Sequence, residues 1–163
     1  MSGQLHHPRH RPQRLRPIPV LLTPRGVQAL RDKAAALRGD VLPELRVAMG
    51  ERDRDRRVDL DYHRVCDDIS ALEDLLRNAG STRDRPLDGR VGLGDLVMVA
   101  VPDGELQVLV VAAEEAFLDE LRISEHSPLA AAMLGAQAGD TVTVRAPGGP
   151  YPARVLSVSR DER

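Results

Sequence analysis

The apolar positions in the first half of the chain recur every three or four residues, as a single packed stripe on a helix requires. The members of this first run are Val27, Leu30, Ala34, Leu37, Val41, Leu45 and Ala48. Thr23-Pro24 supplies a helix start, because a hydroxyl caps the first turn and proline is tolerated at the first helical position. Pro43 interrupts the run. We expect a local kink there, since the stripe continues beyond it.

A second run with the same spacing follows the first. Its members are Tyr62, Val65, Ile69, Leu72 and Leu76. The sequence Asn-Ala-Gly at 78–80 then provides a helix stop. Two amphipathic helices separated by a short polar segment predict an antiparallel coiled-coil hairpin over residues 20–79. Its first arm has about 26 residues and, at roughly 1.5 Å per residue, should be on the order of 39 Å long.

The pattern changes to short alternating segments in the second half. Residues 80–88 are rich in glycine, proline and charge, which is typical of a linker. The segments DLVMVAV and ELQVLVVAA flank a Pro-Asp-Gly turn, and DTVTVRA and YPARVLSVS flank a Pro-Gly-Gly turn, so each pair predicts a β-hairpin. Ser127-Pro128 opens a short helix. Residues 89–159 should therefore form a small antiparallel β-sheet domain with one short helix, and the whole chain should be α+β.

Composition narrows the classes of function. The 163 residues are 42% hydrophobic and 29% charged, which fits a globular protein with a core. Phe117, Tyr62 and Tyr151 are the only aromatic residues, which argues against an aromatic-lined pocket or a base-stacking platform. Cys66 is the single cysteine, so we expect a reducing, cytoplasmic compartment. The apolar stretch at 18–22 is too short for a membrane span or a secretory signal, so we expect no membrane partner.

The first 19 residues are predicted to be a disordered basic tail. Residues 1–17 contain four arginines, three histidines, three prolines and no acid. The net charge of −2 gives no general case for nucleic-acid binding. We therefore expect only a weak electrostatic contact of this tail with nucleic acid, which would weaken as the salt concentration rises.

A dense run of charge, RDRDRRVDLDY at 52–62, lies between the two predicted helices and so at the tip of the rod. It is either a solvated charge run or a site that handles a metal or a phosphate. Carboxylates are ligands that Mg²⁺ prefers, whereas guanidinium groups pair with carboxylates or with phosphates. The candidate residues are Asp53, Asp55, Asp59, Asp61, Arg54, Arg56 and Arg57.

Several motifs together are typical of one family. The segment SPLAAAMLGAQAGDTVTVRAPGG carries the pattern SP-hydrophobic, hydrophobic-G, GD-V-V and PGG. The segments LTPRGVQALRDKAAAL, LPELRVAM and DYHRVCDDISALEDLL look like an opening helix, its proline-containing second half and a returning helix with a Tyr-His pair. In this order, over residues 20–158, the chain resembles the Gre family of bacterial transcription elongation factors.

The resemblance implies an FKBP-like fold for the sheet domain and bacterial RNA polymerase as the partner. In this family the sheet domain binds the rim of the polymerase secondary channel, and the hairpin enters the channel. Two carboxylates at the tip then help to hold a second Mg²⁺, and the polymerase itself cleaves the backtracked RNA. The factor is thus not an enzyme and has no cofactor of its own. The polymerase-binding loop maps to Ser124, Ser127, Pro128 and Leu129, although a helix cap explains Ser127 equally well.

One of the two tip carboxylates has no counterpart in this sequence. With the chains aligned on Tyr62-His63, the family's two acids fall on Asp55 and Val58. Asp55 is the candidate residue for the shared Mg²⁺, whereas Val58 has no oxygen to offer. Asp59 follows directly, but a shift of one residue turns a side chain well away. We therefore predict a Gre-like regulator that inhibits or modulates transcription without efficient transcript cleavage, as anti-Gre relatives do.

The sequence leaves two other functions open and disfavours a third. The chain could be an active Gre factor that stimulates cleavage of backtracked RNA. It could regulate another protein, such as a nucleoside diphosphate kinase, but relatives of that kind carry a shorter hairpin. A prolyl isomerase is disfavoured, because that activity uses an aromatic-rich pocket and this domain contains only Phe117 and Tyr151.

Overall fold

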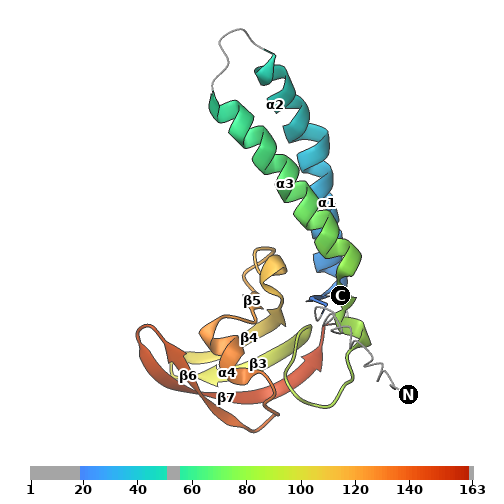
Figure 1. Cartoon of the computed structure of the whole chain (residues 1–163). Helices are drawn as coiled ribbons and strands as arrows, with labels where there is room; N and C mark the ends of the chain where they lie inside the picture. The colour runs from blue at the N-terminus through green and yellow to red at the C-terminus, as the bar shows by residue number, and fades with distance from the viewer. Residues whose placement is uncertain (1–18, 51–55, 162–163) are drawn as a thin grey trace, which may run out of the picture.

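The computed structural model describes residues 19–50 and 56–161, which form a long helical hairpin beside a β-sheet domain (Figure 1). The α+β class is confirmed. The predicted basic tail lies outside the described residues except for residue 19, and so do Asp53, Arg54 and Asp55 at the tip. The predicted domain boundaries stay predictions.

The hairpin has a first arm of three consecutive helical segments and a second arm of one helix. The first arm consists of α1 (Pro24–Ala36), a π-helical segment (Leu37–Val41) and α2 (Leu42–Met49), and the second arm is α3 (Arg56–Asn78). Thr23 caps α1, because its hydroxyl oxygen accepts a hydrogen bond from the Gly26 amide at 3.0 Å. At Pro43 the interruption takes the form of the π-helical segment, in which the Leu42 amide donates to the Leu37 carbonyl. A proline ring clashes with the carbonyl four residues earlier, and a widened turn relieves that clash.

The two arms pack along their apolar stripes. Leu30, Ala34 and Leu42 from the first arm and Ile69 from α3 are buried there. Arg38 and Glu73 form an ion pair across the two arms. Within the described part of the chain, no helix has the length and apolar character that crossing a membrane requires.

The sheet domain contains five strands in the order β5-β4-β3-β7-β6. The strands are β3 (Asp95–Val101), β4 (Gly104–Val111), β5 (Arg122–Ser124), β6 (Thr141–Ala146) and β7 (Gly149–Arg160). Both predicted hairpins are present, as β3–β4 and β6–β7. The sheet is mixed and not wholly antiparallel, because β5 pairs with β4 in parallel. The loop between them carries the chain back along β4 before β5 begins (Figure 1).

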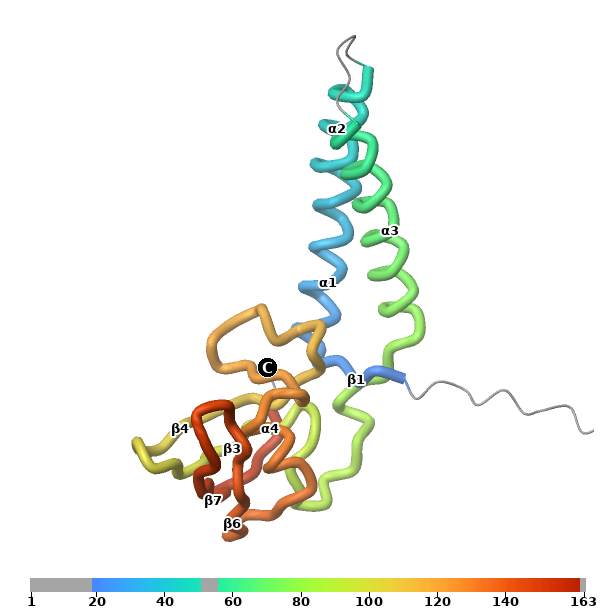
Figure 2. Tube along the Cα trace, turned by 60° about the vertical axis from the view of Figure 1, so that its left-hand side comes forward, coloured from blue at the N-terminus to red at the C-terminus, as the bar shows by residue number. Residues whose placement is uncertain are grey.

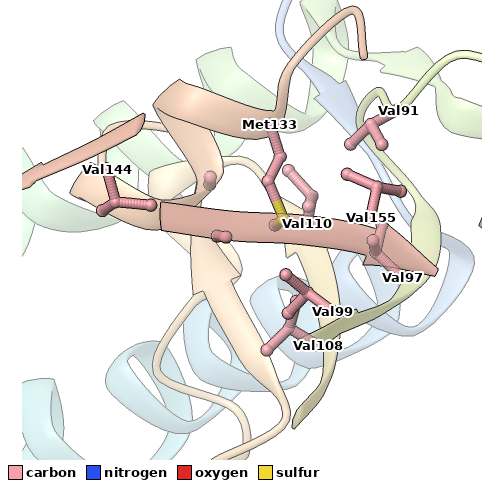
Figure 3. Close-up of a cluster of buried hydrophobic side chains, with 10 residues drawn as sticks. Val91, Val97, Val99, Val108, Val110, Met133, Val144 and Val155 are labelled. Atoms are coloured by element: carbon pink, nitrogen blue, oxygen red, sulfur yellow. The ribbon is translucent and has the colours of Figure 1, made fainter. Parts of the chain in front are cut away.

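The core of this domain lies between one face of the sheet and α4 (Pro128–Met133). Met133 of α4 packs against a layer of valines from the strands (Figure 3). This layer consists of Val97, Val99, Val108, Val110, Val144 and Val155. These valines come from four neighbouring strands and fit the pleated surface well, because their side chains are β-branched.

The hairpin is joined to the sheet domain at its base. Here β1 (Leu21–Leu22) pairs in parallel with β2 (Gly80–Ser81), so the two ends of the hairpin are tied together (Figure 2). Leu22, Leu30 and Ala112 form a second buried cluster, in which the hairpin meets the end of β4. The rod therefore stands on a packed base, and its tip lies at the far end from the sheet (Figure 2).

Candidate functional site: hairpin tip, loop before α4 and domain junction

The described part of the tip is the first two turns of α3. Arg56, Arg57 and Asp61 are exposed there, and Asp59 is half-buried. Asp59 and Asp61 are two positions apart on a helix, so their side chains leave it about 200° apart and cannot clamp one ion together. Asp59 also sits where the helix dipole favours a negative charge, which gives it a structural role.

Val58 belongs to the packed side of α3. It is half-buried and lies one helical turn before Tyr62, which is also half-buried. Among the described residues, no group of three or more His, Cys, Asp or Glu side chains is placed to hold a metal ion. The structure thus brings Arg56, Arg57, Asp59 and Asp61 to one end of the rod without assembling a pair of carboxylates.

A contact between α2 and α3 lies close to the tip. Arg46 Nε of α2 donates to the Tyr62 hydroxyl at 3.4 Å, and the guanidinium carbon lies 5.9 Å from the centre of the Tyr62 ring. The ring of His63 meets that of Tyr62 edge to face, with 5.9 Å between the centroids. The hydrogen bond to Tyr62 raises the pKa of Arg46 above its ordinary value, so Arg46 remains charged.

The loop before α4 gathers the residues predicted to bind polymerase. Ser124 Oγ accepts from the His126 amide at 3.2 Å, and the Ser124 carbonyl accepts from the Ser127 amide at 2.8 Å. Ser127 caps α4 by accepting from the Ala130 amide at 3.3 Å, with Pro128 exposed at the first helical position. Leu129 is half-buried and packs on the core. The structure confirms the helix cap, and the polymerase-binding role of this loop stays a prediction.

A buried polar cluster joins the hairpin to the sheet domain. Glu115 lies in the loop after β4 and is 0% exposed. Its carboxylate accepts from the Thr23 amide at 2.9 Å, from the Thr23 hydroxyl at 2.5 Å and from Arg122 Nη1 at 3.2 Å. Arg122 is buried as well, and its Nε donates to Asp119 at 3.1 Å. We call Thr23, Glu115 and Arg122 the junction cluster.

The junction cluster requires a glycine at its edge. A Cβ atom on Gly26, in the first turn of α1, would lie 1.9 Å from Glu115 Oε2, which is far inside contact distance. Burial raises the pKa of Glu115 above its ordinary value, because a carboxylate loses hydration there, while the Thr23 and Arg122 contacts act in the opposite direction. Sequence reasoning identified Thr23 as a helix cap but missed Glu115 and Arg122. No local motif marks them, since Thr23, which both contact, lies 92 residues from Glu115 and 99 residues from Arg122.

A second buried acid fastens the linker to the sheet. Asp95 at the start of β3 is 1% exposed, accepts from the Gly92 amide at 2.9 Å and forms an ion pair with Arg85 of the linker. Arg160 of β7 approaches the same carboxylate at 3.8 Å. The chain between the hairpin and β3 is therefore held by charge at a defined position.

A cavity of about 580 Å³ lies between the turns of the two β-hairpins. It is lined by Val101, Pro102, Asp103, Leu106, Ala146, Gly148, Gly149, Pro150 and Tyr151. Tyr151 is the only aromatic side chain in this lining, so the cavity is not the aromatic-rich pocket that prolyl isomerisation uses.

Comparison with known proteins identifies relatives of both halves of the chain. Residues 87–160 match a family model described as "Transcription elongation factor, GreA/GreB, C-term". Transcription elongation factor GreA of Geobacillus kaustophilus is 33% identical over 129 residues, which cover 74% of this chain and 82% of that relative. GreA of Nitrosococcus oceani is 33% identical over 144 residues, 80% of this chain and 90% of the relative.

A third sequence relative matches over a shorter length, and solved structures give a further comparison. GreA of Bacillus velezensis is 37% identical over 93 residues, and the chain spans only 59% of that relative's length. Among solved structures, the crystal structure of GreA factor homolog 1 (Gfh1) of Thermus thermophilus is 28% identical. The match covers 87% of this chain and 99% of that one, with a TM-score of 0.38.

Proposed function

Because this chain belongs to the GreA/GreB family of transcription elongation factors, we propose that it binds bacterial RNA polymerase in the cytoplasm and inserts its hairpin into the secondary channel. The loop before α4 contacts the rim of the channel in this proposal, through Ser124, Ser127, Pro128 and Leu129. The hairpin tip then reaches the polymerase active site. The protein acts as a regulator and not as an enzyme, so any RNA cleavage belongs to the polymerase.

The finer proposal is that this tip modulates or inhibits transcription without supporting efficient cleavage. The arrangement of residues 58–61 is the observation that carries it. Val58 is half-buried on the packed side of α3, at the position that the family's second acid would take. Asp59 and Asp61 leave the helix about 200° apart, so neither pairs with the other to clamp an ion. Asp55 remains the one matched acid, and it would approach the polymerase Mg²⁺ alone.

The arginines at the tip also support the proposal of inhibition without efficient cleavage. Arg56 and Arg57 are exposed at the start of α3, and the tip sequence contains Arg52 and Arg54 as well. Guanidinium groups neutralise nearby carboxylates and bind phosphates, often through two parallel hydrogen bonds. A tip of this composition is suited to RNA or nucleotide phosphates near the active site better than to a bare cation. It would compete with substrates there.

The test is a comparison of polymerase binding and transcript yield. Purified core polymerase should bind the full chain, and the yield of full-length transcript should fall as the chain is added. An Asp59→Ala, Asp61→Ala variant should keep most of the inhibition, because these acids form no metal clamp, whereas Arg56→Ala, Arg57→Ala should weaken it. Absence of binding to core polymerase would refute the proposed function. Unchanged transcript yield despite binding would refute the inhibitory role.

A further inference from the structure

Two apolar side chains near the tip are left uncovered by the hairpin. Val47 of α2 is 71% exposed and Leu60 of α3 is 69% exposed. With Leu87 of the linker, which is 74% exposed, they are the most exposed of the large apolar side chains that the structure describes. The rest of the rod keeps its large apolar residues buried or half-buried, so the end of the rod departs from the pattern of the helices that build it.

The two side chains lie at the same level of the rod. The contact of Arg46 with Tyr62 puts these two residues opposite each other across the arms. Val47 directly follows Arg46 in α2, and Leu60 lies two residues before Tyr62 in α3. Both residues are thus slightly nearer the tip than the Arg46–Tyr62 contact, and their positions along the rod axis differ by less than one helical turn of about 5.4 Å.

They lie on opposite sides of the rod at that level. Val47 is two residues from Leu45 and from Met49, which are half-buried on the packed side of α2. Leu60 is likewise two residues from Val58 and from Tyr62 on the packed side of α3. Two residues correspond to about 200° around a helix, so each side chain is directed away from the other arm.

We infer that Val47 and Leu60, here called the apolar pair, contact the wall of a channel that surrounds the rod. A flat docking surface, or one neighbouring copy of this chain, reaches one side of the rod and leaves the other apolar side chain in water. An enclosing wall covers both. The inference rests on the proposed function, in which the secondary channel of the polymerase surrounds the hairpin, and it adds the residues that contact the channel wall.

The experiment measures the affinity of core RNA polymerase for the full chain and four variants. These are Val47→Gln, Leu60→Gln, the double variant, and Leu87→Gln as a control of equal exposure away from the rod. Val47 and Leu60 are exposed helix positions where glutamine is a good helix former, and Leu87 is exposed outside any helix, so thermal unfolding should be unchanged in every variant. Each single substitution should weaken binding about 10-fold through lost apolar burial. The double variant should lose about 100-fold, because sites that do not touch contribute additively. The control should stay within about 2-fold.

The outcomes separate the two proposals. If the unmodified chain binds and inhibits polymerase while the single variants bind equally well, the apolar pair has no such role and the proposed function stands. If only one of the two substitutions weakens binding, the partner is flat and the enclosing wall is wrong. If the unmodified chain forms dimers that the double variant does not, the apolar pair is a self-association surface. If the unmodified chain does not bind polymerase, both proposals fail.

Discussion

Replacement of Glu115 by alanine tests how the hairpin is held on the sheet domain. Glu115 is fully buried and accepts three hydrogen bonds, two from Thr23 at the start of α1 and one from Arg122. Alanine removes the acceptor. The Thr23 amide and the Arg122 guanidinium then stay buried without this partner, which costs more than the hydrogen bonds alone.

The magnitude follows from what remains after the change. Breaking a buried ion pair by removing one partner typically costs about 3–5 kcal/mol. Here Arg122 keeps its contact with Asp119 at 3.1 Å, so we take the lower end, about 3 kcal/mol. For a chain of 163 residues, 1 kcal/mol lowers the midpoint of thermal unfolding by about 2–4 °C, so Glu115→Ala should lower it by about 6–12 °C.

Scanning calorimetry and circular dichroism measure this effect directly. Glu114→Ala is the matched control, because Glu114 is the adjacent residue and is exposed, and its loss should change stability by less than about 0.5 kcal/mol. The hairpin and the sheet should also unfold in separate transitions in Glu115→Ala, since the junction cluster connects them. Equal shifts for the two variants would refute the view that this cluster fixes the hairpin.

Three further predictions concern the same junction and the core. Gly26→Ala should cost about 2–4 kcal/mol, since its Cβ would lie 1.9 Å from Glu115 Oε2, whereas Gly39→Ala, where nothing lies within 4 Å of the added carbon, should stabilise by about 0.5–1 kcal/mol; similar denaturant midpoints for both would contradict this. Because the pKa of Glu115 is raised in the folded state, protonation of Glu115 stabilises the fold; this contribution is fully present below about pH 4.3 and is lost as the pH rises through the folded-state pKa. The stability of the unmodified chain relative to Glu115→Gln should therefore decline above about pH 4.3. A pH-independent difference between the two would argue against it. Met133→Ala should cost about 2–5 kcal/mol in urea unfolding, because Met133 is 0% exposed among the core valines, and a loss below about 1 kcal/mol would show that the core adapts.

The helices and strands were predictable because each depends on neighbours in sequence. Thr23-Pro24 and Ser127-Pro128 cap α1 and α4 as expected, since a cap is a contact over three residues. The stripes of the two helices and the two β-hairpins were likewise read from their spacing. The π-helical segment before Pro43 was foreseen only as a kink, because sequence shows where a proline disturbs a helix but not how the turn relaxes.

The long-range contacts escaped sequence reasoning. The parallel pairing of β5 with β4 depends on the path of the loop between them, so an antiparallel sheet was the wrong expectation for that pair. Nothing in the sequence marks Glu115 and Asp95 as buried, because acidic residues are mostly exposed unless they are paired, and the pairing appears only in the fold. The position of Val58 on the packed side of α3 comes from the structure, since the predicted stripe begins at Tyr62, and this position underlies the proposal for the tip.

The most direct measurement of the central claim uses a backtracked elongation complex with end-labelled RNA. The full chain is added at increasing concentration with Mg²⁺ present, and the cleavage products are compared with those of polymerase alone. A tip that lacks a second carboxylate at Val58 should leave the cleavage rate at the level of polymerase alone while the yield of extended RNA falls. Cleavage that accelerates with the concentration of the chain would contradict the claim.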